Sequence, residues 1–172
     1  MLRSSGALQF GEFTLASGKR SPFYVDIKRA ITRPEILREI ARGLAPFAKG
    51  ADRIAGVELG AVPIAAAVAL ETGTPFIMVR KERKEHGTSK DFEGDLQRGD
   101  RLLFVEDVVT TGGTLVKAIE RVRGHGAEVS DVAVVVDREE GGAAALAGIG
   151  VRVQALLTAA DLLRAANASS LR

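Results

Sequence analysis

The chain has 172 residues, of which 46% are hydrophobic and 27% charged, a composition that suits a folded domain of ordinary size. Its formal net charge of +2, from 24 basic and 22 acidic residues, is too small to indicate a nucleic-acid-binding protein. There is no cysteine for disulfides or thiol catalysis, and neither a signal peptide nor a membrane span of roughly 20 apolar residues stands out, so we expect a cytoplasmic protein.

Two short β-type runs, Phe10–Leu15 and Phe23–Ile27, flank the polar turn Ala16–Pro22 and predict a small hairpin outside the main sheet. Thr32–Glu35 has the pattern of a capping box with proline in the first turn, so a helix should follow it and end near Pro46. The elements expected next are a strand over Arg53–Val57, a turn over Glu58–Val62, a helix from Pro63 to Gly73 and a strand over Pro75–Val79.

A long charged segment over residues 80–99 separates the two halves of the chain. Its length is unusual for a connection in a compact domain and is typical of a functional loop or lid. The elements expected after it are a strand over Leu102–Val105, a helix after Thr114, a strand over Val132–Val136, a helical turn over Ala143–Leu146, a strand over Val151–Leu157 and a helix over Thr158–Asn167.

Strands that alternate with helices, several of them apolar throughout, predict an α/β fold with a mostly parallel, twisted sheet flanked by helices. We expect residues 1–172 to form a single domain. Ligands of such sheets bind at the carboxyl ends of the strands. The turns after Val57, Val79, Asp107 and Val136 should therefore converge on one cleft.

The stretch LLFVEDVVTTGGT, residues 102–114, is the most informative part of the chain. An apolar run leads into Glu106 and Asp107, and Thr110–Thr114 then precedes a helical pattern. A turn of small residues before a helix points several backbone N–H groups at one place beside the positive end of the helix dipole, which suits a phosphate. The paired acids suit hydroxyl groups, such as those of a ribose. An ordinary strand–helix connection is the alternative, although two acids directly after a β-branched run need a reason.

The charged segment begins with a cluster of cations on a glycine-containing loop. Its members are Arg80, Lys81, Arg83, Lys84 and His86. Charge-assisted contacts from such a loop could hold a pyrophosphate and stabilise the charge that grows on a leaving group. A solvated loop of alternating charge is the commoner explanation of such a run, but a neighbouring phosphate site favours the functional interpretation.

The order of residues in the 102–114 motif resembles the signature of the type I phosphoribosyltransferases, which bind phosphoribosyl pyrophosphate (PRPP). The segments that resemble the orotate-using branch of that family are Phe10–Gly18 with Ser21–Tyr24, Val57–Ala65 at the place of the pyrophosphate loop, Arg80–Gly87 and Val136–Gly142. The resemblance spans roughly residues 8 to 165. It implies the type I phosphoribosyltransferase fold, with residues 1–30 as an N-terminal hood and residues 80–99 as a flexible catalytic loop.

The resemblance implies transfer of ribose 5-phosphate from PRPP to orotate, giving orotidine 5′-phosphate and diphosphate in pyrimidine (UMP) biosynthesis. It implies Lys84, His86 and Asp107 as catalytic residues, and Thr110 and Arg138 as contacts of orotate. The PRPP-binding residues that it implies are Arg80, Lys81, Lys84, His86, Glu106, Asp107, Val108, Val109, Thr110, Thr111, Gly112, Gly113 and Thr114. Mg²⁺ is the implied cofactor, without an assigned protein ligand. A homodimer that shares loop residues is the implied assembly, and neither nucleic acid nor membrane is an expected partner.

Two positions depart from the family pattern. Ala16 stands where a lysine that reaches the active site is usual, and Gly60 where bacterial members often carry one; Lys19 or Arg20 could approach the same region. Two alternatives share the central motif: a type I phosphoribosyltransferase for a purine or uracil, and a non-catalytic protein that senses PRPP. The N-terminal element, the charged loop and Asp137–Arg138 favour orotate.

Overall fold

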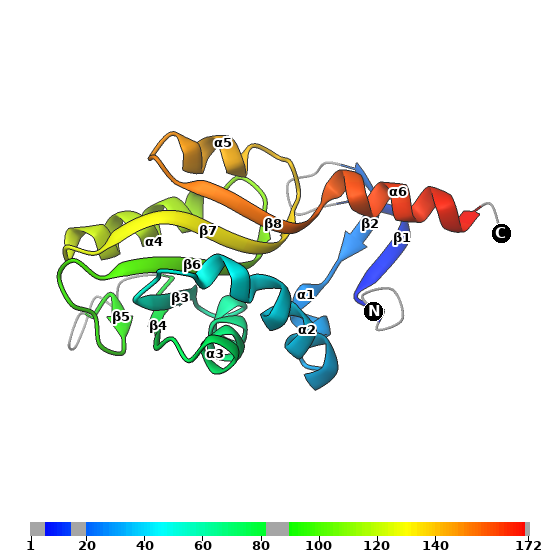
Figure 1. The fold of residues 1–172 in the computed structure, drawn as a ribbon. Helices are drawn as coiled ribbons and strands as arrows, with labels where there is room; N and C mark the ends of the chain where they lie inside the picture. The colour runs from blue at the N-terminus through cyan, green and yellow to red at the C-terminus, as the bar shows by residue number, and fades with distance from the viewer. Residues whose placement is uncertain (1–5, 15–19, 82–89, 171–172) are drawn as a thin grey trace.

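The computed structural model describes residues 6–14, 20–81 and 90–170, and a six-stranded sheet lies at its centre. The strands of this sheet are β3 (Arg53–Val57), β4 (Phe76–Val79), β5 (Phe92–Glu93), β6 (Arg101–Val109), β7 (Glu128–Asp137) and β8 (Arg152–Thr158). Their spatial order is β5-β4-β3-β6-β7-β8, and every neighbouring pair is parallel except β4 and β5. The predicted α/β sheet is confirmed, and its twist is visible in Figure 1.

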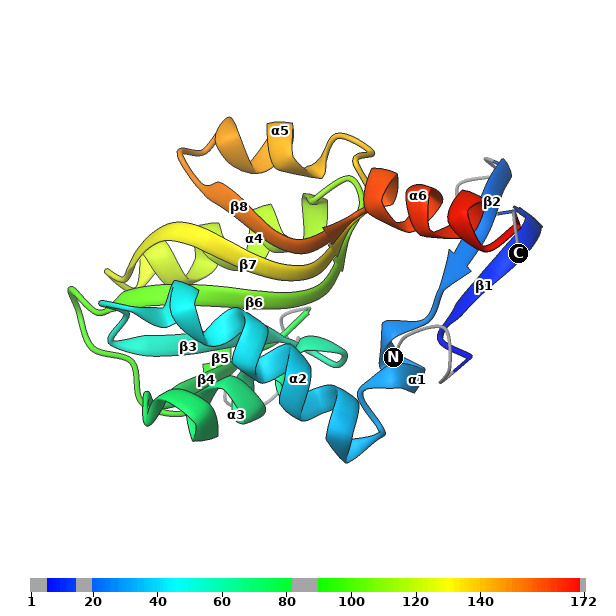
Figure 2. The same cartoon turned by 45° about the vertical axis from the view of Figure 1, so that its right-hand side comes forward.

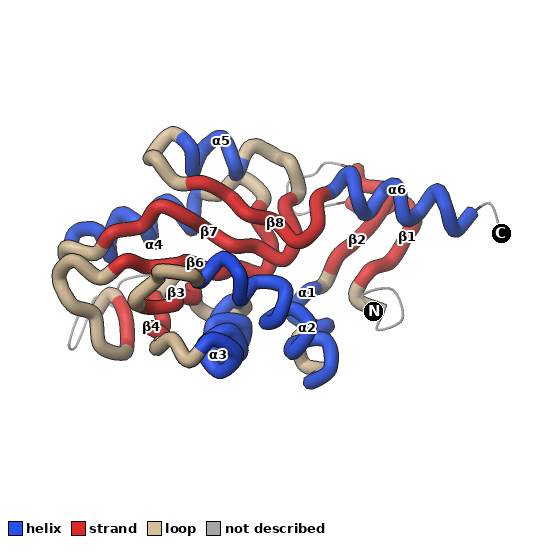
Figure 3. Tube along the Cα trace, in the orientation of Figure 1, coloured by secondary structure: helices blue, strands red, loops and turns tan. Residues whose placement is uncertain are grey.

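Helices cover both faces of the sheet (Figure 3). They are α2 (Pro34–Leu44), continued by the 3₁₀ helix η1 (Ala45–Ala48), and α3 (Ala61–Thr72) on one face, and α4 (Gly113–Gly124) and α5 (Gly142–Ala147) on the other. The first face buries Ile54 and Leu103 in one hydrophobic cluster, and the second buries Phe104 and Val134 in another. Because successive strand residues point to opposite faces and both faces are covered, the central strands are apolar throughout.

A separate two-stranded hairpin stands beside the sheet. Its strands β1 (Leu8–Thr14) and β2 (Arg20–Val25) pair antiparallel, and Figure 2 shows them next to the last helix, α6 (Ala159–Ser170). Phe23 of β2 and Leu162 of α6 belong to the same buried cluster as α2 and α3, which ties the hairpin to the domain. The predicted hairpin is confirmed; Ala16 and Lys19 lie outside the described residues.

The sequence prediction is wrong between the hairpin and α2. The second strand ends at Val25, and a four-residue helix, α1 (Ile27–Ala30), follows it, with the Asp26 carboxylate accepting from the backbone N–H of Arg29 at 3.0 Å. No capping box forms, because α2 has Arg33 as its N-cap and no side-chain cap. The Thr32 hydroxyl instead donates to the carbonyl of Arg29 at 2.7 Å, so it serves the end of α1.

The other differences extend or add elements at the carboxyl ends of strands. The strand predicted over Leu102–Val105 continues as β6 to Val109, because β7 supplies a parallel partner as far as Asp137. The segment predicted as a loop over residues 80–99 contains β5, which pairs with β4. Helix α3 begins at Ala61 and not at the predicted Pro63. Proline is tolerated in the first turn because the N–H groups there have no intrahelical partner. Among the described residues, no helix combines the length and apolarity that a membrane crossing requires.

Candidate active site

The paired acids lie near the end of β6, directly before its last two residues, Val108 and Val109, at the carboxyl edge of the sheet. The Glu106 carboxylate accepts from the backbone N–H of Asp107 at 3.0 Å, and that of Asp107 accepts from the N–H of Val108 at 2.7 Å. Burial raises the pKa of Glu106 well above its usual range, and the neighbouring Asp107 raises it further. Two carboxylates are thus held side by side, where a hydroxyl-rich group or a cation would relieve their repulsion.

The turn after β6 is the segment predicted to bind an anion. Gly112 takes a left-handed conformation, with φ of 77°, as the residue before α4, and its carbonyl accepts from the N–H of Val116 at 2.9 Å. A small hollow of about 90 Å³ is lined by Glu106 and residues 108–115. Thr110, Thr111 and Thr114 are exposed there, whereas the Val109 side chain is buried in the core. The N–H groups at the start of α4 and the threonine hydroxyls can therefore bind a phosphate.

This turn packs directly against the turn that follows β7. A Cβ at Gly142 would lie 2.3 Å from Val109 Cγ1 and 2.6 Å from the carbonyl oxygen of Thr110. A Cβ at Gly112 would lie 3.1 Å from the carbonyl oxygen of Gly142. The N–H of Arg138 also donates to the carbonyl of Val109 at 2.9 Å. Glycine at both positions allows the backbones of the two turns to pack in direct contact.

Arg138 extends from the end of β7 toward the hairpin and is mostly buried, with 9% of its side chain exposed. Its guanidinium lies 4.8 Å from the centre of the Phe23 ring and 3.4 Å from the Ser21 hydroxyl of β2. It forms an ion pair with Glu140 at 3.1 Å, and its Nε has no hydrogen-bond partner among the described atoms. The hairpin and the turn after β7 thus enclose a planar guanidinium whose Nε–H group is available to a ligand.

The turn after β3 reaches the acid pair. A Cβ at Gly60 would lie 2.5 Å from Asp107 Oδ2 and 2.9 Å from Cε of Lys28, a residue of α1. Lys28 also lowers the pKa of Glu106, although burial and Asp107 outweigh it. The position at which the sequence lacks a lysine is therefore approached by a lysine from another element.

Arg80 and Lys81 are the described members of the cation cluster at the start of the charged segment. Arg80 donates to Glu93 Oε1 at 2.7 Å and lies 3.7 Å from Glu58 Oε1. Its backbone carbonyl accepts from Arg121 of α4, and that of Lys81 accepts from the same guanidinium at 3.3 Å. Helix α4 therefore fixes the start of this loop. Lys84 and His86, both predicted to be catalytic, lie outside the described residues.

The turns after β3, β4, β6 and β7 contact one another at the carboxyl edge of the sheet, as predicted. Arg80 after β4 meets Glu58 after β3, Gly60 meets Asp107 of β6, and Val109 meets Gly142 after β7. The sequence prediction missed Lys28 and Glu93 as neighbours of the site. The Asp26 cap of α1 was a local signal that could have revealed the helix carrying Lys28, whereas the place of Glu93 depends on the pairing of β5 with β4.

Comparisons with known proteins agree on one family. A family model described as a phosphoribosyl transferase domain matches residues 29–149. The chain is 47% identical over 173 residues to the orotate phosphoribosyltransferase of Pyrococcus horikoshii, covering 98% of this chain and 93% of the relative. It is 50% identical over 161 residues to that of Methanothermobacter thermautotrophicus, covering 94% and 89%. The crystal structure of orotate phosphoribosyltransferase from Aeropyrum pernix matches with a TM-score of 0.83 at 36% identity, covering 96% of each chain. This chain belongs to the type I phosphoribosyltransferases.

Proposed function

We propose that this chain is an orotate phosphoribosyltransferase, which transfers ribose 5-phosphate from PRPP to orotate and yields orotidine 5′-phosphate and diphosphate on the route to UMP. The observation that carries the proposal is that Glu106 and Asp107, the helix N-terminal turn that follows them and the mostly buried Arg138 meet at the carboxyl edge of the sheet. The names of the relatives support the same activity.

The donor would lie along the carboxyl end of β6. Its 5′-phosphate would bind the N–H groups and hydroxyls of Thr110–Thr114, to which Val108 and Val109 would contribute backbone only. Its 2′ and 3′ hydroxyls would donate to Glu106 and Asp107. Arg80 and Lys81, with Lys84 and His86, would contact the pyrophosphate, and Arg80 would exchange one of its carboxylate partners for phosphate oxygens.

The acceptor would lie between the hairpin and the β7 turn. Orotate is a planar ring with a carboxylate, and a guanidinium offers that carboxylate a matching planar set of donors. Arg138 has a free Nε and an ion pair with Glu140 that the ligand's carboxylate would replace or extend. Thr110 lies next to the same turn and would approach the ring from the donor side.

In the reaction, N1 of orotate attacks C1′ of the donor, the C1′–O bond breaks with inversion, and its electron pair leaves with pyrophosphate. Orotate reacts as the anion that forms when N1 loses its proton to solvent, because the electron-poor ring holds that proton weakly. The ribose becomes cationic as the bond breaks, and the carboxylates of Glu106 and Asp107 stabilise that charge. The cations of the 80–87 loop stabilise the charge on the leaving group.

Mg²⁺ is part of this proposal. The carboxylate oxygens of Glu106 and Asp107 are the hard donors that Mg²⁺ accepts, and this ion is usually held by one or two carboxylates together with substrate phosphates and water. These residues would hold it with the ribose and pyrophosphate oxygens of PRPP. When bound, it neutralises charge on the pyrophosphate. We further propose a cytoplasmic homodimer in which loop residues contribute to the partner's site.

One assay tests the activity. The purified protein is incubated with PRPP, Mg²⁺ and one of orotate, uracil, adenine or hypoxanthine, and diphosphate release is followed. Release with orotate alone supports the proposal. Release only with a purine or uracil would assign the chain to another branch of the family, and binding of PRPP without release for any base would indicate a sensor.

A further inference from the structure

Lys28 is a cation beside the paired acids, and the sequence prediction assigned it no role. Its Cε and the Asp107 carboxylate both lie within 3 Å of the place that a Cβ at Gly60 would take, at 2.9 and 2.5 Å. Lys28 comes from α1, in the connection between the hairpin and α2, so it approaches the acid pair from outside the main sheet. Its side chain lies along the turn after β3.

The backbone that carries Lys28 is firmly placed. Ile27 and Ala30 of α1 are fully buried, and the Asp26 carboxylate caps the helix at the N–H of Arg29. The N–H of Asp26 donates to the carbonyl of Ala7 at 2.7 Å, which ties α1 to the start of the hairpin. Only the side chain of Lys28 is therefore left to adjust to a ligand.

The charge of Lys28 is also uncommitted. Within the described part of the chain, no carboxylate lies within ion-pair distance of its ammonium group, whereas Arg80 pairs with Glu58 and Glu93, and Arg138 pairs with Glu140. A lysine that lies beside two carboxylates without pairing with either is available to a third, anionic group.

The geometry of the donor indicates which anion that would be. With its 5′-phosphate in the Thr110–Thr114 turn and its hydroxyls on the acid pair, PRPP presents C1′ on the side away from the 5′-phosphate. Asp107 borders Gly60 on that side, so the pyrophosphate on C1′ would extend over Gly60. We propose that the Lys28 ammonium binds the pyrophosphate of PRPP above Gly60, and that Gly60 lacks a side chain because Lys28 and Asp107 fill its space. This inference rests on the proposed function and adds a donor-binding residue to it.

The role follows from charge. Glu106 and Asp107 suit a cationic ribose but repel the pyrophosphate next to it, and this repulsion grows as the C1′–O bond breaks. An ammonium between Asp107 and the leaving group opposes it, and a lysine is a compact charge that can follow the phosphate as it departs. Lys28 would therefore act on the donor and its departure, and would leave orotate binding unchanged.

The experiment compares Lys28→Met, which keeps the length and removes the charge, with Lys28→Arg and with Arg29→Met. Arg29 is the matched control, since it is the next residue, is also exposed, and has its guanidinium 3.6 Å from the Cβ position of Gly6. The readouts are kcat/KM for PRPP, KM for orotate, and the Kd of inorganic diphosphate with Mg²⁺ by calorimetry.

We expect Lys28→Met to lower kcat/KM for PRPP and to raise the Kd of diphosphate, each by about 10-fold or more, as loss of a charge-assisted contact does. The KM for orotate should change less than about twofold, and Lys28→Arg should recover part of the loss. If Lys28→Met and Arg29→Met behave alike in all three readouts, the proposal is wrong. The diphosphate titration needs no acceptor base, so it tests Lys28 even if the wild-type protein does not use orotate.

A double-mutant cycle tests the claim that Lys28 fills the space beside Gly60. Gly60→Ala introduces a methyl group against Lys28 Cε and Asp107 Oδ2. Its cost in diphosphate affinity should be smaller in Lys28→Ala than in the wild type, because one of the two clashes is gone. Equal costs in both backgrounds would show that Lys28 does not occupy this space when diphosphate binds.

Discussion

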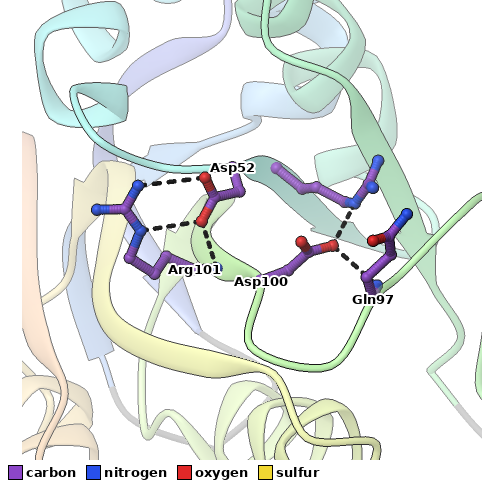
Figure 4. A network of polar contacts seen from close by, with 5 residues as sticks. Asp52, Gln97, Asp100 and Arg101 are labelled. Carbon is purple, nitrogen blue, oxygen red and sulfur yellow. Dashed lines mark hydrogen bonds and ion pairs between the residues drawn. The ribbon is translucent and has the colours of Figure 1, made fainter.

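Two pairs of acids at opposite edges of the central sheet, Asp52 with Asp100 and Glu106 with Asp107, differ in the charges around them. At the amino edge, where β3 and β6 begin, the Asp52 carboxylate accepts from Nε and Nη2 of Arg101 at 2.9 and 3.2 Å, and from the Arg101 backbone N–H at 2.9 Å (Figure 4). Asp100 accepts from Arg53 Nε at 2.5 Å and from the N–H of Gln97 at 2.8 Å. Each acid there has its own cation.

The pKa values follow this difference. Hydrogen bonds from Arg101 lower the pKa of Asp52 to about 2, and hydrogen bonds from Gln97 and Arg53 lower that of Asp100 against the opposing effect of burial. At the carboxyl edge, burial and Asp107 raise the pKa of Glu106. The two acids at the amino edge are thus paired with cations of the protein, whereas Glu106 at the carboxyl edge lies against another acid, an arrangement that is common at functional sites.

The largest effect should come from Asp107→Asn at the carboxyl edge. Loss of one carboxylate that supports the cationic ribose should lower kcat/KM for PRPP by about 100-fold. Steady-state kinetics at varied PRPP measures it. The same substitution at the amino edge, Asp52→Asn, is the control and should leave kcat/KM within about twofold. Similar losses in the two variants would abolish the distinction between the edges.

Arg138→Ala should weaken the use of the acceptor, orotate, far more than the use of the donor, PRPP. Removal of the guanidinium should raise KM for orotate by about 10- to 100-fold, because a charge-assisted contact is lost, while KM for PRPP changes far less. Initial rates at varied orotate and varied PRPP give both constants. Equal changes in the two constants would mean that Arg138 acts on the site as a whole.

At the amino edge the expected loss is in stability. The side chains of Arg53 and Asp100 are each 15% exposed and are joined by a hydrogen bond, so Asp100→Asn should lower the free energy of unfolding by about 1–3 kcal/mol. Urea denaturation measures this loss, and diphosphate release at saturating substrates should stay near the wild-type rate. A large loss of turnover in a folded Asp100→Asn protein would show that the two edges are coupled.

The smallest effect is a change in pH dependence. Because the pKa of Glu106 is higher in the folded protein than in the unfolded chain, the folded state binds that proton more tightly, and stability falls as pH rises through the raised pKa. In Glu106→Gln this loss should be absent, so its free energy of unfolding should decline less than that of the wild type as pH rises above 4.5. Parallel curves for the two proteins would contradict the raised pKa.

The sequence predicts the sheet and the turn between β6 and α4 well because both depend on local patterns. The apolar run of β6, the small residues before α4 and the order of strands and helices follow from neighbouring residues. The sequence does not predict that β6 continues through Glu106 and Asp107, because the partner strand β7 decides its length. It also misplaces the cap at Thr32, since an alternative cap at Asp26 creates α1.

Long-range pairing limits the prediction of the site in the same way. The ion pairs of Arg80 with Glu58 and Glu93 depend on β5 folding back onto β4, which no local pattern indicates. Lys28 reaches Gly60 only because α1 lies at the carboxyl edge of the sheet. The assignments of Lys84 and His86 remain predictions, because these residues lie outside the described part of the chain.

The contact between Gly112 and Gly142 has a consequence for how such an enzyme can change its acceptor. Because neither glycine tolerates a side chain without displacing the other turn, the backbone that positions Arg138 cannot shift without disturbing the phosphate turn. A new acceptor is therefore accommodated more easily by replacing side chains at Arg138, Glu140 or Phe23 on a constant backbone than by remodelling the turn after β7. Variant libraries for altered base preference should hold both glycines fixed and diversify those three positions.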